Sequence, residues 1–367
     1  MSSAAGWSEI REKPLVVCDV ALFYAERSGG IRTYLDEKAR FAAATGAFEH
    51  HLLLPGRRER HHNFRHELRA LQLAASNGYR LPLGARALRE TLRMIGPDVV
   101  ALHDPFWRPL SVTREAHRLG AAVVAVHHAS PALNAAGLPG PDAVYLRPLR
   151  RIYHHAYEHV DAVMSEVDPE PDSGRSASIP LRLGLHPAFR PGPAPPGEHL
   201  LYVGRLSLEK RIGDLLSAMA MRGWGRPLRL IGEGPARGII EARARKLGLG
   251  GLVQFHPFVA DRPTLARCYR EAACVVAPGP HETFGLAVLE AAASGARVVA
   301  CSSTPAARVA GALVAPFTPK DPVALAGAVE RALATPRDAA AAARLADSMS
   351  WDRVFTAELE DLRRLCR

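Results

Sequence analysis

Residues 278–295 read PGPHETFGLAVLEAAASG. The overlapping run ACVVAPG at 273–279 is typical of a buried strand, and FGLAVLEAAASG is typical of an amphipathic helix that Gly295 closes. The first turn of such a helix leaves backbone N–H groups unpaired at the positive end of its dipole. This strand, turn and helix therefore predict a parallel α/β fold and an anion site near Phe284.

Two glutamates flank the start of this helix. Glu282 stands just before it and Glu290 nearly two turns into it. Glu282 could instead cap the helix, and Glu290 could be an exposed helix residue. The apolar neighbours Leu289, Ala291 and Ala292 argue against an exposed Glu290. A largely buried carboxylate near an anion site needs a neutral polar partner, and sugar hydroxyls donate hydrogen bonds to carboxylates.

Short apolar runs alternate with helical patterns along most of the chain, which predicts parallel sheets of βαβ units. The break lies at 189–200, FRPGPAPPGEHL, where four prolines and two glycines indicate an extended linker. We expect an N-terminal domain at 1–190, a second doubly wound domain at 191–349 and a terminal helix at 350–367. The expected strands are 14–20, 50–55, 97–103, 121–128 and 161–167, followed by 199–204, 228–234, 252–258, 273–279, 296–302 and 311–316.

Ligands of doubly wound sheets bind beyond the carboxyl ends of the strands, and one such end carries two cations. Gly204 ends the run HLLYVG, and Arg205 and Lys210 follow on a turn that leads into a helix. A guanidinium fork and an ammonium suit diphosphate oxygens, although a solvated loop would have the same composition. The segment IGEGP at 231–235 is weaker evidence, because Gly-x-Gly often marks only a tight turn.

Together, the Glu282-x7-Glu290 spacing within PHETFGLAVLEAAASG, VGRLSLEKRIGDLLSA, IGEGP and the N-terminal SGGIRTYL resemble the retaining GT-B glycosyltransferases of family 4, the glycosyl transferases group 1 family. The resemblance covers nearly the whole chain and extends to bacterial lipid- or glycan-directed α-mannosyltransferases. It implies two Rossmann-like doubly wound domains that face a cleft. The first would bind the acceptor and the second the nucleotide sugar, while the terminal helix would cross back to the first.

The resemblance also implies roles for matched residues. Arg205 and Lys210 would bind the donor diphosphate and stabilise it as the leaving group. Glu282 would hold hydroxyls of the donor sugar, and Glu290 those of the ribose. Backbone N–H groups at the helix start would complete the phosphate cradle. One departure is the turn at 301–311, CSSTPAARVAG, where family members often carry Gly-Gly-x-Pro-Glu. The implied donor-binding residues are Gly30, Arg205, Lys210, Glu282, Thr283, Phe284, Gly285, Leu286 and Glu290.

The N-terminal half adds three candidates. Gly30, in SGGIRTYL, would let the backbone approach the donor diphosphate or the acceptor closely, or it marks only a turn. In lipid-directed relatives the strand matched by VAVHHAS ends in a His followed by Thr or Ser, which puts His128 near the donor sugar. His103 would line the acceptor side, as His128 would, unless it is a satisfied structural histidine. The expected catalytic residues are His128, Arg205, Lys210 and Glu282.

The net charge of +10 suits phosphorylated substrates or an anionic lipid surface, and no nucleic-acid-binding signature accompanies it. Five cysteines without a CxxC, no signal peptide and no apolar run of bilayer length predict a cytoplasmic protein. The densest basic stretch, 55–72, is expected as a solvated loop and helix. Alternatively, its part at 57–69 makes peripheral contact with anionic lipid on the inner face of the membrane.

We therefore expect a retaining α-glycosyltransferase that moves a hexose from a nucleotide-diphosphate sugar, GDP-mannose favoured, to a lipid-linked or glycan hydroxyl. Both glutamates are assigned to hydroxyls, so front-face displacement is expected. No Asp-x-Asp motif and no complete ligand set indicate a metal, and no cofactor is expected. The alternatives are a UDP-sugar donor (glucose, galactose or GlcNAc) with a small-molecule or polysaccharide acceptor, or a sugar-nucleotide epimerase. A Rossmann oxidoreductase would need GxGxxG after the first strand, and a non-catalytic binding module would be expected to lack the cations or Glu282.

Overall fold

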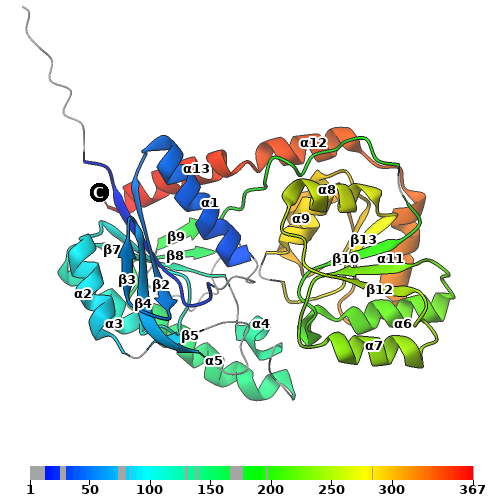
Figure 1. The fold of residues 1–367 in the computed structure, drawn as a ribbon, viewed down its shortest axis with the longest axis horizontal. Coiled ribbons are helices and arrows are strands. Elements are labelled where there is room, and N and C mark those ends of the chain that lie inside the picture. Colours follow the sequence, from blue (N-terminus) through cyan, green and yellow to red (C-terminus); the bar gives the residue numbers. More distant parts are fainter. Residues whose placement is uncertain are drawn as a thin grey trace, which may run out of the picture.

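The computed structural model describes residues 13–24, 30–72, 80–82, 84–128, 131–136, 138, 140–165, 177–195, 197–282 and 284–366. Figure 1 shows two lobes side by side, each built on its own sheet with helices packed around it. The two sheets follow from the alternation of apolar runs and helical patterns, as predicted. The expected domain bounds at 190 and 349 stay predictions.

The first lobe holds, over the described residues, a nine-stranded sheet in the order β3-β4-β2-β1-β6-β7-β8-β9, with β5 paired to β4. Its pairs are parallel except β3–β4 and β4–β5. The central strands β1 and β6 are buried along their whole length, because helices cover both faces of the sheet. The strands are β1 (Val16–Val20), β2 (Glu49–Gly56), β3 (Arg60–His62), β4 (Arg65–Gln72), β5 (Arg80–Pro82), β6 (Val99–Leu102), β7 (Ala122–Val126), β8 (Ala162–Ser165) and β9 (Ala177–Pro180).

The second lobe holds a six-stranded sheet, again counted over the described residues, in the order β12-β11-β10-β13-β14-β15. All of its pairs are parallel. Every strand expected in this half is present, although the last begins late because a 3-10 turn, η2 (Gly311–Leu313), precedes it. The strands are β10 (Leu200–Val203), β11 (Leu228–Ile231), β12 (Val253–His256), β13 (Cys274–Ala277), β14 (Val298–Cys301) and β15 (Val314–Phe317).

Helices connect the strands, and local chemistry explains several of their starts. Asp261, Asp321 and Asp338 each accept hydrogen bonds from backbone N–H groups of the helix that follows. Within the described ranges, no helix is both long and apolar enough to cross a membrane. The helices are α1 (Gly30–Thr45), α2 (Arg86–Ile95), α3 (Pro109–Arg118), α4 (Pro131–Ala136), α5 (Asp142–Tyr157), η1 (Leu208–Lys210), α6 (Ile212–Arg222), α7 (Arg237–Lys246), α8 (Arg262–Glu271), α9 (Leu286–Ala293), α10 (Pro305–Ala310), α11 (Pro322–Ala334), α12 (Ala339–Ser348) and α13 (Trp351–Leu365).

The basic stretch 55–72 was expected as a loop and helix, but it contains no helix and most of it forms strands, joined by exposed turns at 57–59 and 63–64. It forms β3 and β4 at the edge of the first sheet. Along β4, His66, Leu68 and Ala70 are buried while Arg65 and Arg69 are exposed, which is the two-residue period of a strand. Arginine is not among the residues enriched in strands, so the composition of this stretch did not predict a strand.

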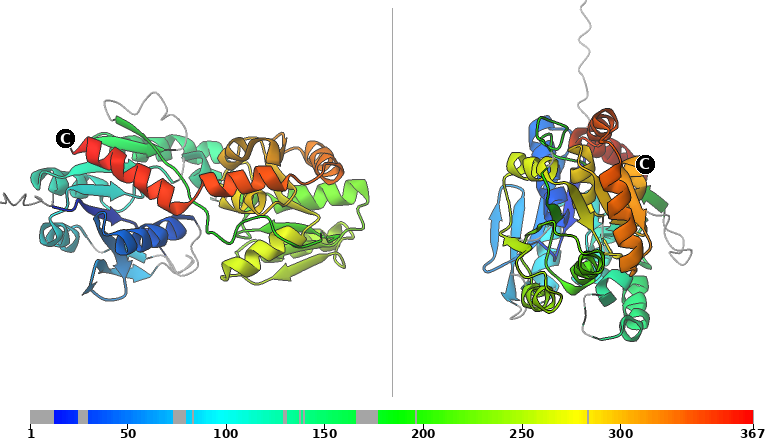
Figure 2. Two further views of the ribbon diagram at one scale, coloured as in Figure 1. Left: turned by 90° about the horizontal axis from the view of Figure 1, so that it is seen from above. Right: turned by 90° about the vertical axis from the view of Figure 1, so that its right-hand side faces the viewer.

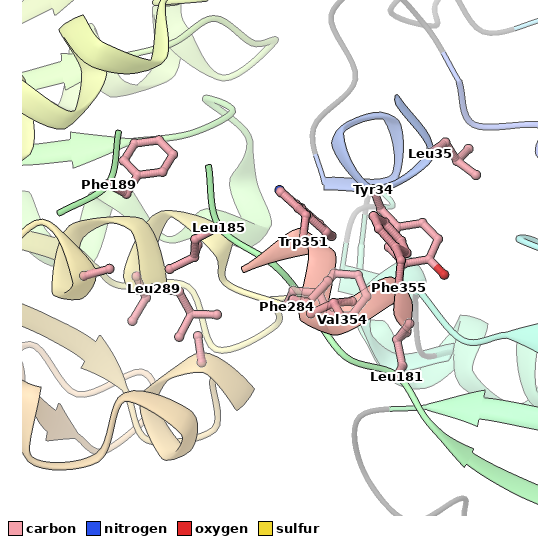
Figure 3. Close-up of a cluster of buried hydrophobic side chains, with 14 of the residues drawn as sticks. Tyr34, Leu35, Leu181, Leu185, Phe189, Phe284, Leu289, Trp351, Val354 and Phe355 are labelled. Carbon is pink, nitrogen blue, oxygen red and sulfur yellow. The ribbon is translucent and has the colours of Figure 1, made fainter. Parts of the chain in front are cut away.

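The last helix joins the two lobes. Figures 1 and 2 show α12 on the second lobe, while α13 lies on the first lobe beside α1. In Figure 3, Trp351, Val354 and Phe355 of α13 lie between Tyr34 of α1 and Phe284 of the second lobe. These side chains belong to one buried apolar cluster that continues through both lobes. The lobes therefore share a core at this point.

A tight contact holds the start of α13. Leu185 donates a backbone hydrogen bond to Met349 O at 2.6 Å. A Cβ at Gly184 would lie only 2.3 Å from the indole of Trp351, so glycine is required there. The indole in turn stacks on Phe355, with ring centroids 5.2 Å apart. The chain that leaves the first lobe and the helix that returns to it are thus packed against each other.

Candidate functional site

The start of α9 has the geometry of an anion site. Its N-cap, Gly285, has φ = +74°, a conformation that favours glycine. A Cβ there would lie 2.7 Å from the Thr304 methyl group. The first turn of any helix leaves backbone N–H groups without intrahelical partners, and here that turn follows the buried Phe284. Because the N-cap residue Gly285 has no side chain, no side chain at that position caps this helix. Glu282 is therefore not its N-cap.

Lys210 and Glu282, which are 72 residues apart, form an ion pair. The Nζ atom of Lys210 lies 2.6 Å from Oε2 of Glu282, and the two side chains are 17% and 18% exposed. A Cβ at Gly279 would lie 3.2 Å from the Cα of Lys210 and 3.3 Å from Oε1 of Glu282. The small residue at 279 therefore lets the two strand-end loops come together.

Arg205 lies on the same loop as Lys210, with its side chain exposed. The hydroxyl of Tyr202 donates a 2.8 Å hydrogen bond to the Arg205 carbonyl and so fixes the backbone. The IGEGP segment supports this loop from the other side. A Cβ at Gly232 would lie 2.1 Å from Gly204 O, and one at Gly234 would lie 2.2 Å from Leu206 O. The two glycines are thus needed for close packing of two loops.

Glu290 is buried, so the alternative of an exposed helix residue is wrong. Its side chain accepts a 2.9 Å hydrogen bond from the hydroxyl of Tyr269, and Arg262 lies 3.5 Å away. Burial raises the pKa of Glu290 to about 6, although Arg262 and the Tyr269 hydrogen bond act in the opposite direction. Arg262 also donates to the hydroxyl of Thr33 on α1 at 3.2 Å, which ties this carboxylate to the first lobe.

Gly30 brings the first lobe to the same place. It is the first residue of α1, and a Cβ there would lie 3.3 Å from Leu286 Cδ1 and 3.7 Å from Phe284 Cδ2. The starts of α1 and α9 therefore face each other between the lobes. Thr283, the remaining donor-binding candidate, lies outside the described residues.

His128 and His103 are buried next to this meeting point. The ring of His128 makes an edge contact with Phe284 at a centroid distance of 5.5 Å. Its Nε2 lies 2.6 Å from Nδ1 of His103, whose Nε2 lies 2.7 Å from Asp19 Oδ1. Both ring nitrogens of His103 thus have protein partners, which is the arrangement of a satisfied structural histidine. A contact between His103 and an acceptor stays a prediction.

Sequence reasoning missed three groups that hold the site. Asp19 is a lone carboxylate within an apolar strand, and no motif distinguishes it. In the CSSTP turn, Ser303 donates a hydrogen bond to Pro280 O at 2.6 Å, and Thr304 donates one to Gly279 O at 3.4 Å. The turn that departs from the family pattern therefore anchors the backbone just before Glu282. In the sequence, the two adjacent hydroxyl side chains of Ser303 and Thr304 after a strand were the feature that could have indicated this role.

Comparisons with known proteins agree with this geometry. A family model described as glycosyl transferases group 1 matches residues 189–348. A GDP-mannose-dependent alpha-(1-6)-phosphatidylinositol dimannoside mannosyltransferase of Mycobacterium tuberculosis is 31% identical over 94% of this chain and 95% of its own length. A D-inositol 3-phosphate glycosyltransferase of Frankia alni is 34% identical over 58% of this chain and 54% of its own length.

Solved structures show the same fold. Sucrose-phosphate synthase from Thermosynechococcus elongatus superimposes with a TM-score of 0.79 at 18% identity, covering 96% of this chain and 99% of that one. The Anabaena protein HepE, solved with UDP-glucose, gives a TM-score of 0.70 at 16% identity, covering 95% and 99%. The fold is thus GT-B, as the sequence predicted. With a mannosyltransferase relative that matches along nearly its whole length, the chain belongs to the glycosyl transferases group 1 family and is a hexosyltransferase.

Proposed function

We propose that this glycosyltransferase moves mannose from GDP-mannose to a lipid-linked or glycan hydroxyl with retention of the α configuration. The donor and the lipid acceptor are supported by the mycobacterial relative, whose name specifies GDP-mannose and a phosphatidylinositol dimannoside. The main structural support for a donor site here is the Lys210–Glu282 ion pair beside the start of α9. It brings one cation for phosphate and one carboxylate for hydroxyls to the same point.

In this proposal, binding of the donor separates the Lys210–Glu282 ion pair. The donor diphosphate accepts hydrogen bonds from the Lys210 ammonium, from the Arg205 guanidinium and from the start of α9. The groups at the helix start are the backbone N–H groups of Phe284, Gly285 and Leu286. Glu282, released from Lys210, accepts hydrogen bonds from hydroxyls of the sugar, and His128 contacts the same sugar. Stabilisation of the leaving diphosphate by fixed cations lowers the barrier directly, and these cations would do so without a metal or cofactor.

The acceptor hydroxyl then attacks the face of the sugar that the diphosphate leaves. The C1–O bond to the diphosphate breaks, the C1–O bond to the acceptor forms, and the hydroxyl proton passes to the departing phosphate oxygen. The two glutamates are both assigned to hydroxyls, so no carboxylate is proposed as a covalent nucleophile.

Replacing Arg205 or Glu282 by Ala should reduce kcat/KM by roughly a hundredfold or more, because each removes a charged contact that strengthens in the transition state. Steady-state kinetics with GDP-mannose would measure this. Arg226 is a matched control, since it is a partly exposed arginine of the same lobe that donates to the Glu198 carbonyl at 3.0 Å. Near-normal rates for either variant, with Arg226→Ala also normal, would refute the assignment.

Glu290 is proposed to hold the ribose hydroxyls, and its burial gives a separable pH test. Because its folded-state pKa lies above the ordinary 4.5, ionisation of Glu290 destabilises the fold. This cost is absent below about pH 4.5 and fully present above about pH 6, where it reaches roughly 2 kcal/mol. Stability of the native chain should therefore fall as pH rises through this window.

Glu290→Gln removes the titration while keeping an acceptor for Tyr269. Relative to the native chain, the variant should gain roughly 2 kcal/mol of unfolding free energy between pH 4.5 and pH 7, measured by urea denaturation. Its affinity for the nucleotide sugar should drop roughly tenfold or more, because a carboxylate acceptor is lost. Parallel stability curves for the two proteins would contradict the buried, ionised carboxylate.

We propose further that the outer surface of β3 and β4 contacts anionic lipid. Phe64 and Leu71 are 54% and 57% exposed there, which places large apolar side chains among cations. Each basic group near an anionic leaflet contributes about 1 kcal/mol to binding. The exposed arginines of these strands and of the turn that precedes β3 are Arg57, Arg58, Arg60, Arg65 and Arg69.

Vesicle flotation tests this contact. The protein should float with vesicles that contain anionic lipid and stay behind with neutral ones, and replacing Arg57, Arg58 and Arg60 by Gln should abolish flotation.

The matched control makes the same change in charge at exposed positions of the second lobe, Arg245, Lys246 and Arg344. Flotation that is independent of lipid charge, or lost equally in both triple variants, would overturn a specific role for β3 and β4.

A further inference from the structure

We propose that Asp19 acts through His103 to hold His128 in one tautomer, so that His128 presents the lone pair of Nδ1 to a hydroxyl of the donor sugar. Asp19 and His103 would then be positioning residues for the transfer. This inference rests on the proposed function, in which His128 contacts the donor. It explains why three buried polar side chains from three neighbouring strands form a chain of contacts that ends beside Phe284.

The chain starts at an ionised carboxylate. Asp19 lies on β1, fully buried, with the ammonium of Lys38 at 3.0 Å and ring nitrogens of His103 and His50 within hydrogen-bonding distance. Burial raises the pKa of Asp19, but the charge of Lys38 and the two histidine hydrogen bonds outweigh it and hold that pKa well below its usual value. An ionised carboxylate only accepts hydrogen bonds.

The proton positions follow from that acceptor. His103 must donate Nε2–H to Asp19 across 2.7 Å. A neutral imidazole carries one N–H, so Nδ1 of His103 becomes an acceptor. Nε2 of His128, 2.6 Å away, must then donate to it. His128 itself is neutral, because burial holds its pKa well below the usual value.

In the proposed arrangement His103 is neutral. Its side chain is 1% exposed, and Lys38 already supplies a positive partner for Asp19. Burying a second cation beside Lys38 would carry a further desolvation cost. With His103 neutral, one arrangement of protons satisfies both contacts.

The arrangement leaves one acceptor unused. Nδ1 of His128 is buried, and none of the residues that the structure describes donates a hydrogen bond to it. An unpaired buried acceptor is unfavourable, and a ligand hydroxyl would remove that cost. The rings of His128 and Phe284 meet nearly at right angles, and Phe284 directly precedes the helix start that is proposed to bind the diphosphate. In this proposal a hydroxyl of the donor bound beside Phe284 reaches Nδ1 of His128, and a group that cannot donate a hydrogen bond is rejected.

Long-range ¹⁵N–¹H correlation spectra of protein labelled at histidine nitrogens test the tautomer in the absence of substrate. The His128 signals are assigned by their loss in His128→Gln. We expect Nε2 of His128 to be protonated and Nδ1 to be bare at neutral pH. A protonated Nδ1, as would result from a charged His103, would overturn the proposal.

Asp19→Asn should change the His128 signals to a mixture of both tautomers and lower kcat roughly tenfold or more with the acceptor KM unchanged. If this variant does not fold, His103→Gln serves the same purpose, since it removes the bond that fixes His128. An unchanged His128 tautomer in the folded variant would overturn the proposal.

His50→Gln is the matched control. It also removes a histidine from Asp19 but leaves the His103 contact, so the His128 tautomer and kcat should stay near native values. A tautomer mixture in this variant, as large as in Asp19→Asn, would show that general loosening of the lobe is responsible. If the tautomers behave as expected but no sugar is transferred, the proposed function fails while the proton arrangement stands.

Discussion

Lys38 is 2% exposed and lies between two buried carboxylates, Asp19 on β1 and Glu358 on α13, at 3.0 and 2.9 Å. Charges are stable in an interior only when they are paired and hydrogen-bonded, and removing one partner leaves the others uncompensated. Tyr34 adds its hydroxyl to Glu358. The same carboxylate of Asp19 also receives His103, so this buried network connects the last helix of the chain to the residues beside Phe284.

Two features of the architecture depend on that network. The helix that crosses from the second lobe is held to the first by an ion pair with Lys38 and by the contacts of Trp351 and Phe355 with the Tyr34 ring. The starts of α1 and α9 also face each other closely. A side chain in place of Gly30 would displace Leu286, because a Cβ there would lie 3.3 Å from Leu286 Cδ1. A donor held between them would touch both lobes, which is how a GT-B enzyme can bring donor and acceptor together.

Much of the fold and part of the site were predictable from the sequence. Buried parallel strands are continuous apolar runs, so the strands of the second lobe and the central strands of the first were evident. Glycines at close approaches and a carboxylate among small residues identified the segments around Gly30, Gly285 and Glu290. Their predicted contacts with a donor stay predictions, but their positions near one another are now explained by named contacts.

Other features could not be read from one sequence. Strands β3 and β4, at one edge of the first sheet, are rich in arginine and histidine. The pairing of β4 with β2 and of β3 with β4, rather than composition, makes them strands. Asp19, Lys38 and Glu358 are far apart in the chain, and only tertiary structure brings three ordinary charged residues into one buried group. Ser303 and Thr304 act through the backbone carbonyls of another turn, and such contacts leave no pattern in composition.

The central claim is the transfer of mannose from an α-linked nucleotide sugar with retention by this family member. The most direct measurement is NMR of the anomeric proton and carbon of the product formed from GDP-mannose and a phosphatidylinositol mannoside acceptor. The account predicts free GDP together with a new α-linked mannoside. A β-linked product, or an isomerised nucleotide sugar without any glycoside, would contradict it.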